Sequence, residues 1–388
     1  MQAPVKSRRI GAALLSALLL TSLAGCGSLN PFSGSKPRNQ PAPLVNFTPS
    51  MTTRTLWTAN VGKSGDFFLM PAVAAGKVYA AGSDGELAAI DAANGKSLWR
   101  TKVAGGITAG VASDGTTVVV AGGAGNIIAF DAKTGKQRWA AQASTEILSV
   151  PAVGGGVVVV RSIDNKISAY DADSGERRWF VQRNAPALVL RAAPGILYDD
   201  GVAYVALPAG RLLALSAATG VPRWEAMIAE PRGATELERV ADVSGMPVLS
   251  GRDVCAAAYQ GRIACIDASN GSVRWAREFS AEVGPGIDQR YVFGSDERGN
   301  VTALSRESGG SLWRNDSLAW RGLSAPASFG RAVVVGDRQG YLHFLSREEG
   351  NLLARIRVGD GVRAAPVPVG ESLLVQTVDG KLLAIASN

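Results

Sequence analysis

The sequence has few of the residues from which most catalytic and metal sites are built. Its 388 residues include one histidine and three cysteines. A single histidine excludes metal sites made of several histidines, and most catalytic arrangements that pair serine or cysteine with histidine. Three cysteines are too few for a disulfide-rich scaffold or a zinc site of four thiolates. We therefore expect no bound metal ion.

Charge is also scarce, because only 19% of the residues are charged and the net charge is +7. Three of these positive charges, Lys6, Arg8 and Arg9, lie within the first 25 residues, which contain no acidic residue. The remaining chain has no lysine-rich tract of the kind that binds nucleic acid. We expect no nucleic-acid partner.

The apolar run from Ile10 to Leu20 is too short to span a bilayer, which needs about 20 apolar residues. Basic residues before a short apolar run are typical of an export signal. The run is followed by Leu23-Ala24-Gly25-Cys26, which resembles the bacterial lipoprotein box. We expect residues 1–25 to be a signal peptide and Cys26 to carry a lipid; the alternative is an ordinary signal with a chance cysteine. Gly27, where inner-membrane lipoproteins carry aspartate, favours the outer membrane.

Residues 27 to about 50 are rich in proline, glycine and serine. Such a segment cannot bury enough apolar surface to order itself. We expect residues 26–52 to be the lipidated cysteine and a flexible tether, and residues 53–388 to be one folded domain.

A repeat of about 42 residues organises that domain. Each copy has an Asp or Ser, a Gly four residues later and a Trp four residues after that, as in Asp91, Gly95 and Trp99. Short apolar runs and turn pairs such as Asp84-Gly85 separate these motifs, which indicates four short strands per repeat. In the last copy Ala354 replaces Trp. Six tryptophans belong to full copies of the motif, and Trp57 continues their spacing without an Asp…Gly turn before it; the seven are Trp57, Trp99, Trp139, Trp179, Trp224, Trp275 and Trp313.

Four short antiparallel strands per repeat are typical of a propeller blade. The last segment, Ala365 to Ala386, supplies three strands without a Trp strand, whereas Trp57 lies on a strand without a blade. Pairing the two ends completes an eighth blade and covers both edges. We therefore predict an all-β, eight-bladed β-propeller closed by its terminal strands, with each Trp buried between neighbouring blades.

These repeats resemble those of the eight-bladed quinoprotein-type propellers. Together with the lipoprotein box and the length, they make the chain similar to the BamB family of lipoproteins, which belong to the outer-membrane β-barrel assembly machinery (BAM complex). The resemblance implies a non-catalytic scaffold on the periplasmic side of the outer membrane that docks on the periplasmic domains of BamA. A further possible partner is an unfolded outer-membrane protein. The sequence does not decide whether the chain contacts such proteins directly.

The enzymes with such repeats suggest the main alternative, a quinone-dependent dehydrogenase. Those enzymes hold pyrroloquinoline quinone and Ca²⁺ with an adjacent cysteine pair and acidic ligands on inserted loops, and this chain has no adjacent cysteines and few insertions. We therefore expect no cofactor and no catalytic residue. A propeller that binds cell-wall or carbohydrate ligands is a third hypothesis.

The spacing of the tryptophans indicates where a partner binds. Two successive intervals, of 45 and 51 residues, are longer than the others, and their excess falls in residues 181–195 and 225–247. Long loops on a rigid scaffold commonly carry binding residues. If residues 188–190 are extended, Leu188 and Leu190 point the same way and Val189 points the other way; the alternative is that both leucines belong to the blade core.

In the BamB family, a Leu-x-Leu-Arg segment and an acidic loop about fifty residues later contact BamA. The matching residues here are Leu188, Leu190, Arg191 and Asp242, and Ser244 stands where other members often carry a second Asp.

Cys255 and Cys265 flank the Gln260-Gly261 turn almost symmetrically. On paired strands they would be close enough for a disulfide; the alternative is two buried thiols.

Overall fold

The computed structural model describes residues 39–184, 186–190 and 194–388. Residues 41–388 form one compact unit. Its eight sheets each contain four antiparallel strands, as the repeat predicts. No helix occurs in the described part of the chain, and therefore none there is long and apolar enough to cross a membrane.

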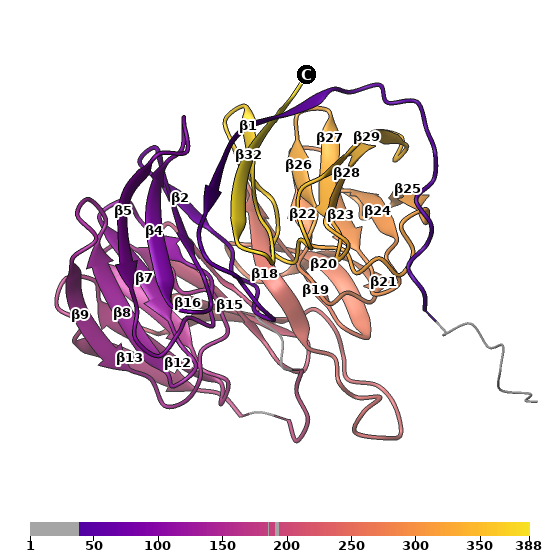
Figure 1. The fold of residues 1–388 in the computed structure, drawn as a ribbon. Coiled ribbons are helices and arrows are strands. Elements are labelled where there is room, and N and C mark those ends of the chain that lie inside the picture. Colours follow the sequence, from indigo (N-terminus) through magenta and orange to yellow (C-terminus); the bar gives the residue numbers. More distant parts are fainter. Residues whose placement is uncertain (1–38, 185, 191–193) are drawn as a thin grey trace, which may run out of the picture. The chain divides into compact units, whose positions relative to one another are not determined.

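In blades 1 to 7 the four strands follow one another along the chain, from an inner strand at the propeller axis to an outer strand at the rim (Figure 1). Blade 1 contains β2 (Ala72–Ala74), β3 (Lys77–Ala81), β4 (Glu86–Asp91) and β5 (Ser97–Lys102). Blade 2 contains β6 (Ala112–Ser113), β7 (Thr117–Ala121), β8 (Asn126–Asp131) and β9 (Gln137–Gln142). Blade 3 contains β10 (Ala152–Gly154), β11 (Val157–Arg161), β12 (Lys166–Asp171) and β13 (Arg177–Gln182). Blade 4 contains β14 (Ile196–Asp199), β15 (Val202–Leu207), β16 (Arg211–Ser216) and β17 (Pro222–Met227). Blade 5 contains β18 (Val243–Ser250), β19 (Asp253–Ala258), β20 (Gly261–Asp267) and β21 (Val273–Phe279). Blade 6 contains β22 (Gly286–Ile287), β23 (Tyr291–Ser295), β24 (Val301–Ser305) and β25 (Ser311–Asn315). Blade 7 contains β26 (Ala327–Phe329), β27 (Ala332–Gly336), β28 (Tyr341–Ser346) and β29 (Leu352–Arg357).

Blade 8 joins the two ends of the folded unit. It contains β30 (Val367–Val369), β31 (Ser372–Gln376), β32 (Lys381–Ser387) and β1 (Thr53–Asn60). β1 pairs antiparallel with β32 from Thr53 opposite Ser387 to Asn60 opposite Lys381. The predicted closure by the terminal strands is therefore present, and β1 supplies the outer strand that the last repeat lacks.

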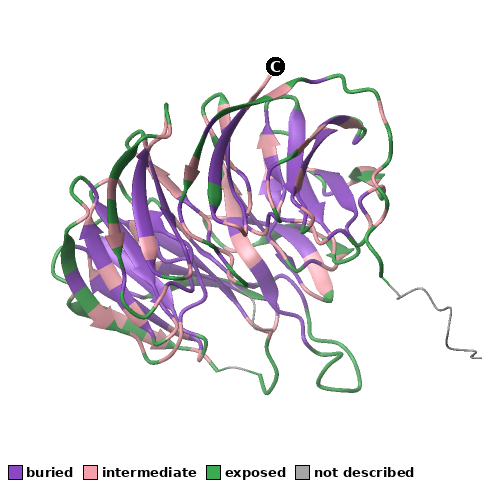
Figure 2. Cartoon of the chain, viewed as in Figure 1, coloured by how far each residue is buried: buried purple, intermediate pink, exposed green. Residues whose placement is uncertain are grey.

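The core is divided among the interfaces between blades. Eight clusters of buried apolar side chains are found in the described residues, and each combines residues of two neighbouring blades. The two middle strands of a blade are almost entirely buried, whereas the outer strand alternates between exposed and partly buried positions (Figure 2). The alternation arises because the outer strand has one face against the next blade and one toward solvent.

The segment between Pro41 and Thr52 belongs to the propeller, which differs from the expected flexible tether. It runs along the outer edge of blade 7 before β1 begins (Figure 1). The amides of Ser50 and Met51 both donate to the carbonyl of Leu353 in β29, at 3.0 and 3.2 Å, and Met51 is buried. Its composition predicts disorder, but its apolar side chains are spaced among the prolines closely enough to cover a strand edge. We call residues 41–52 the N-terminal strap.

Candidate functional site

The two long insertions predicted from the repeat spacing are the two longest connections between blades. Residues 183–195 join blade 3 to blade 4, and residues 228–242 join blade 4 to blade 5. All connections between blades leave from one end of the propeller, which we call the connection face (Figure 1, lower end). Both long connections therefore lie on the same face, in neighbouring sectors of the ring.

The two leucines of the first connection that are predicted to dock are not part of the blade core. Leu188 is 43% exposed and Val189 is 41% exposed, whereas Leu190 is partly buried. The described residues between β13 and Leu190 form no strand, so the alternation expected for an extended segment is absent. Arg191 lies outside the described residues. The second connection carries another exposed apolar side chain, Leu237, which is 72% exposed.

Asp242 is buried, although its expected role in an acidic loop suggests a surface residue. It is 5% exposed, and its two carboxylate oxygens accept hydrogen bonds from the backbone N–H of Leu190 at 2.6 Å and of Ala209 at 3.0 Å. Asp242 thus ties the first long connection to the turn between β15 and β16. Ser244 is also buried and donates its hydroxyl to the carbonyl of Asp242 at 3.3 Å. Sequence spacing alone gave no signal for this burial.

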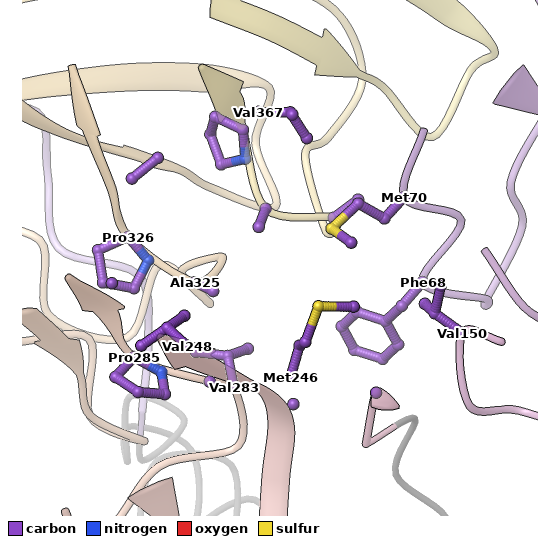
Figure 3. A pocket seen from close by; sticks show the side chains of 18 of the residues that line it. Phe68, Met70, Val150, Met246, Val248, Val283, Pro285, Ala325, Pro326 and Val367 are labelled. Carbon is purple, nitrogen blue, oxygen red and sulfur yellow. The ribbon is translucent and has the colours of Figure 1, made fainter. Parts of the chain in front are cut away.

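A cavity of about 750 Å³ lies on the propeller axis and adjoins the first long connection. Its wall is mostly apolar, and the side chains that point into it include Phe68, Met70 and Met246 (Figure 3). Leu190, which is predicted to contact a partner, also lines the cavity. Charged lining residues pair with one another, namely Arg363 with Asp66 at 3.1 Å and Arg338 with Glu282 at 3.9 Å. Sequence reasoning missed this cavity, because its lining residues come from blades 4 to 8 and from connections around the ring, including those that lead into blades 1 and 3.

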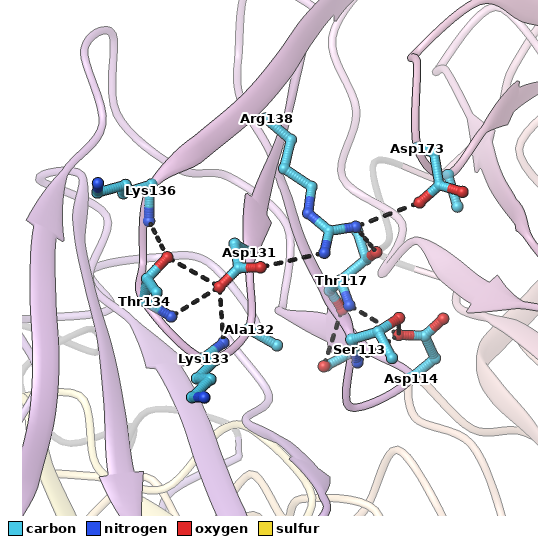
Figure 4. A network of polar contacts seen from close by, with 12 residues as sticks. Ser113, Asp114, Thr117, Asp131, Ala132, Lys133, Thr134, Lys136, Arg138 and Asp173 are labelled. Atoms are coloured by element: carbon cyan, nitrogen blue, oxygen red, sulfur yellow. Dashed lines mark hydrogen bonds and ion pairs between the residues drawn. The ribbon is translucent and has the colours of Figure 1, made fainter.

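The repeated Asp motif forms a turn that is held by its own side chain. In blade 2 the Asp131 carboxylate accepts hydrogen bonds from the backbone N–H of Lys133 and from the N–H and hydroxyl of Thr134, at 2.8 to 3.1 Å (Figure 4). Arg138 donates to Asp131 at 3.1 Å and to Asp173 of blade 3 at 3.3 Å. The Thr134 hydroxyl and the Arg138 guanidinium lower the pKa of Asp131 to about 2. This turn is therefore structural, and it also links two blades.

The seven tryptophans of the repeat pattern lie at the blade interfaces. Each indole N–H donates to a backbone carbonyl of the next blade, at 2.7 to 3.1 Å. The donors are Trp57, Trp99, Trp139, Trp179, Trp224, Trp275 and Trp313, and the acceptors are Ala92, Ala132, Ala172, Ala217, Ala268, Arg306 and Arg347. The Gly of the next turn lies against each indole ring.

Cys255 and Cys265 lie opposite each other on β19 and β20. The structure joins them in a disulfide with a Cα–Cα distance of 4.1 Å, within a fully buried apolar cluster. They are neighbours across two strands and not the adjacent pair of the quinone enzymes. Cys26 lies outside the described residues. Among the described residues, no group of three or more His, Cys, Asp and Glu side chains could hold a metal ion.

Comparison with known proteins adds evidence on the family. The model of the family described as outer membrane protein assembly factor BamB matches residues 49–108, 83–315 and 297–388. The protein of that name from Bordetella pertussis is 42% identical over 386 residues, which cover 99% of this chain and 100% of the relative.

Solved structures also include a protein of that name with a similar fold. The crystal structure of BamB from Moraxella catarrhalis has a TM-score of 0.80 at 26% identity, and covers 86% of this chain and 100% of that one. Quinohemoprotein alcohol dehydrogenase from Comamonas testosteroni has a TM-score of 0.67 at 16% identity, over 86% of this chain and 76% of the enzyme. The second likeness shows a common fold alone. The chain belongs to the outer membrane protein assembly factor BamB family.

Proposed function

We propose that the chain is a non-catalytic scaffold lipoprotein of the β-barrel assembly machinery. It docks on the periplasmic domains of BamA and assists the folding and insertion of outer-membrane proteins. Membership of the BamB family supports the assembly role, since that is what the relatives' names describe. The same names support a place at the outer membrane; the lipid on Cys26 and the periplasmic side are part of the proposal.

The observation that carries the docking surface is the meeting of the two long connections on one face. A carboxylate of the second connection holds the backbone of the first, directly beside the exposed Leu188 and Val189. Exposed apolar side chains on a fixed backbone make good anchors, because they desolvate on binding and little conformational entropy is lost. We infer that Leu188, Leu190 and Arg191 contact BamA and that Asp242 positions them.

The test is the affinity of the chain without its signal peptide for purified BamA periplasmic domains. The double variant Leu188→Ala/Leu190→Ala should bind at least about tenfold more weakly, the scale expected when interface anchors are truncated. Leu98→Ala is the matched control, because Leu98 is 47% exposed on the outer strand β5 of blade 1 and should not affect binding. No binding by the parent chain would refute the proposal. Equal losses in the control and the test variant would refute the site.

A further inference from the structure

Asp242 is the point at which three parts of the connection face meet. Its carboxylate accepts the N–H groups of Leu190 and Ala209, and its backbone carbonyl accepts the N–H of Tyr259 at 2.9 Å. These three residues lie in the first long connection, in the β15–β16 turn and in the β19–β20 turn. Burying a carboxylate is costly unless hydrogen bonds and an opposite charge compensate it.

A buried cation of the neighbouring blade, Arg161, the last residue of β11 in blade 3, bonds to β15, the strand that leads into the Ala209 turn. Arg161 is only 7% exposed, and its Nη1 donates to the carbonyl of Ala206 at 2.6 Å. Ala206 is in β15, three residues before Ala209 in the β15–β16 turn, so Arg161 and Asp242 bond to the same short stretch of chain. Burial lowers the pKa of Arg161 to about 10, against the charge of Asp242, which raises it. The guanidinium therefore stays charged at neutral pH.

We propose that Arg161 is a positioning residue of the docking surface. Its hydrogen bond to Ala206 fixes the end of β15, and the turn that follows is bonded to the Asp242 carboxylate. That carboxylate in turn holds the backbone of Leu190 beside the axial cavity. This inference rests on the proposed docking function, and it adds a residue that a partner cannot reach. The described residues of the first long connection from 183 to Leu190 form no strand, so no sheet pairing holds them.

The experiment uses the chain without its signal peptide and the variant Arg161→Met, which keeps the length of the side chain and removes its charge. The matched control is Arg321→Met. Arg321 is another buried arginine, whose side chain is 6% exposed and pairs with Asp337 at 2.7 Å, but it lies between blades 6 and 7. Two quantities are measured for each variant. One is the affinity for BamA periplasmic domains, and the other is hydrogen exchange of the Leu190 amide, which needs no partner.

Arg161→Met should bind about tenfold more weakly, the scale of a hydrogen bond to a charged group. Its Leu190 amide should exchange at least about tenfold faster, because the bond to Asp242 opens more often. Arg161→Lys keeps the charge and should restore most of the affinity for BamA and most of the protection of the Leu190 amide. Arg321→Met should match the parent in both. The double variant Arg161→Met/Asp242→Asn should lose little more affinity than the weaker-binding of the two single variants. The losses should not add, because both residues act on Leu190 through the same hydrogen bonds.

Parent-like binding and exchange in Arg161→Met would overturn the inference. An equal loss in Arg321→Met would also overturn it, because the effect would then be general destabilisation. If the parent does not bind BamA, the proposed function fails, whereas the exchange of Leu190 still tests the link between Arg161 and Asp242. Should Arg161→Met not fold, Arg161→Gln removes the charge and keeps a hydrogen-bond donor, and parent-like exchange at Leu190 in that variant would contradict the proposal.

Discussion

At the scale of single residues, the repeat motif describes a contact between blades. The Trp of one blade reaches the turn of the next, where a backbone carbonyl accepts its N–H and a glycine lies against its ring. A side chain at that glycine would enter the indole. This explains why the motif pairs Trp with a Gly from another repeat, and why the spacing is so regular.

The exception at Ala354 has a physical reason. Ala354 is on β29 and faces blade 8, whose outer strand β1 comes from the start of the folded unit. No chain turn joins β32 to β1, so the carbonyl and glycine that receive an indole elsewhere are absent from this interface among the described residues. Buried Met51 packs in the same cluster as Ala354 and fills this space. The sequence shows that Ala354 replaces Trp, but the reason is apparent only from the way in which the terminal strands close the propeller.

Gly135→Ala tests the contact, because a Cβ there would lie 2.6 Å from ring atoms of Trp99. Gly76→Ala is the matched control. Gly76 has φ +71° against +70° for Gly135, and a Cβ there meets nothing within 4 Å. The control should lose about 1 to 2 kcal/mol of the free energy of unfolding, from the left-handed backbone alone. Gly135→Ala should lose about 1 to 3 kcal/mol more from overpacking, as measured in urea. Equal losses would show that the indole moves aside without cost.

Other residues had no signal in the sequence. Asp242 was expected as an acidic surface contact, yet its burial follows from three chain segments that meet only in the folded ring. Arg161 gave no sign of a special role, since arginines occur throughout the repeats. The positions of Trp57 to Trp313 could be predicted because a period along the chain repeats them. The positions of Asp242 and Arg161 could not, because no period contains them.

At the scale of elements, the lengths of the connections between blades could be predicted from the sequence, whereas their backbone conformations could not. The two long connections follow from repeat spacing alone. The alternation of Leu188, Val189 and Leu190 depends on an extended backbone, and the structure forms no strand there. The N-terminal strap shows the same limit. Proline and glycine suggested a tether as far as residue 52, but Phe47 and Met51 find partners on blade 7 that local composition does not reveal.

Arg355 is the side chain that holds the middle of the strap. It donates to the carbonyl of Val45 at 2.7 Å, and its guanidinium carbon lies 5.1 Å from the centre of the Phe47 ring. Arg355→Met should raise hydrogen exchange of the Ser50 and Met51 amides several-fold and leave the melting temperature within about 2 °C, because only a local segment opens. Arg357→Met is the control on the same strand, since Arg357 is exposed and stacks on Tyr341 instead. Unchanged exchange in Arg355→Met would show that backbone hydrogen bonds hold the strap without it.

At the scale of the whole molecule, the fold could be predicted by counting the repeats and their Trp strands. The fold alone does not determine the function. A lone Trp strand at one end and a missing one at the other require closure by the termini, and β1 pairs with β32 as that argument predicts. The same eight-bladed ring occurs in quinohemoprotein alcohol dehydrogenase. What separates this chain from such enzymes is its membership of the BamB family, not its architecture.

The strap changes how a lipid anchor would hold the propeller. The folded unit begins at Pro41, and Ala42 bonds to the carbonyl of Ala319 in the connection between blades 6 and 7. The chain thus leaves the propeller on the connection face, three blades along the ring from the connection that carries Leu188. A tether from a lipid on Cys26 then has only residues 27–40, which reach at most about 50 Å when fully extended.

This arrangement separates anchoring from docking, and the separation can be tested. Labelled palmitate should enter the parent chain and not Cys26→Ala, whose product should also be released from membranes. In detergent, Cys26→Ala should nevertheless bind BamA periplasmic domains with the affinity of the parent. The reason is that the strap and the two long connections proposed to dock lie in different sectors of the ring. Equal labelling of both chains would refute the lipid on Cys26. A large loss of affinity in Cys26→Ala would show that the anchor itself contributes to docking, and that the two sectors do not act independently.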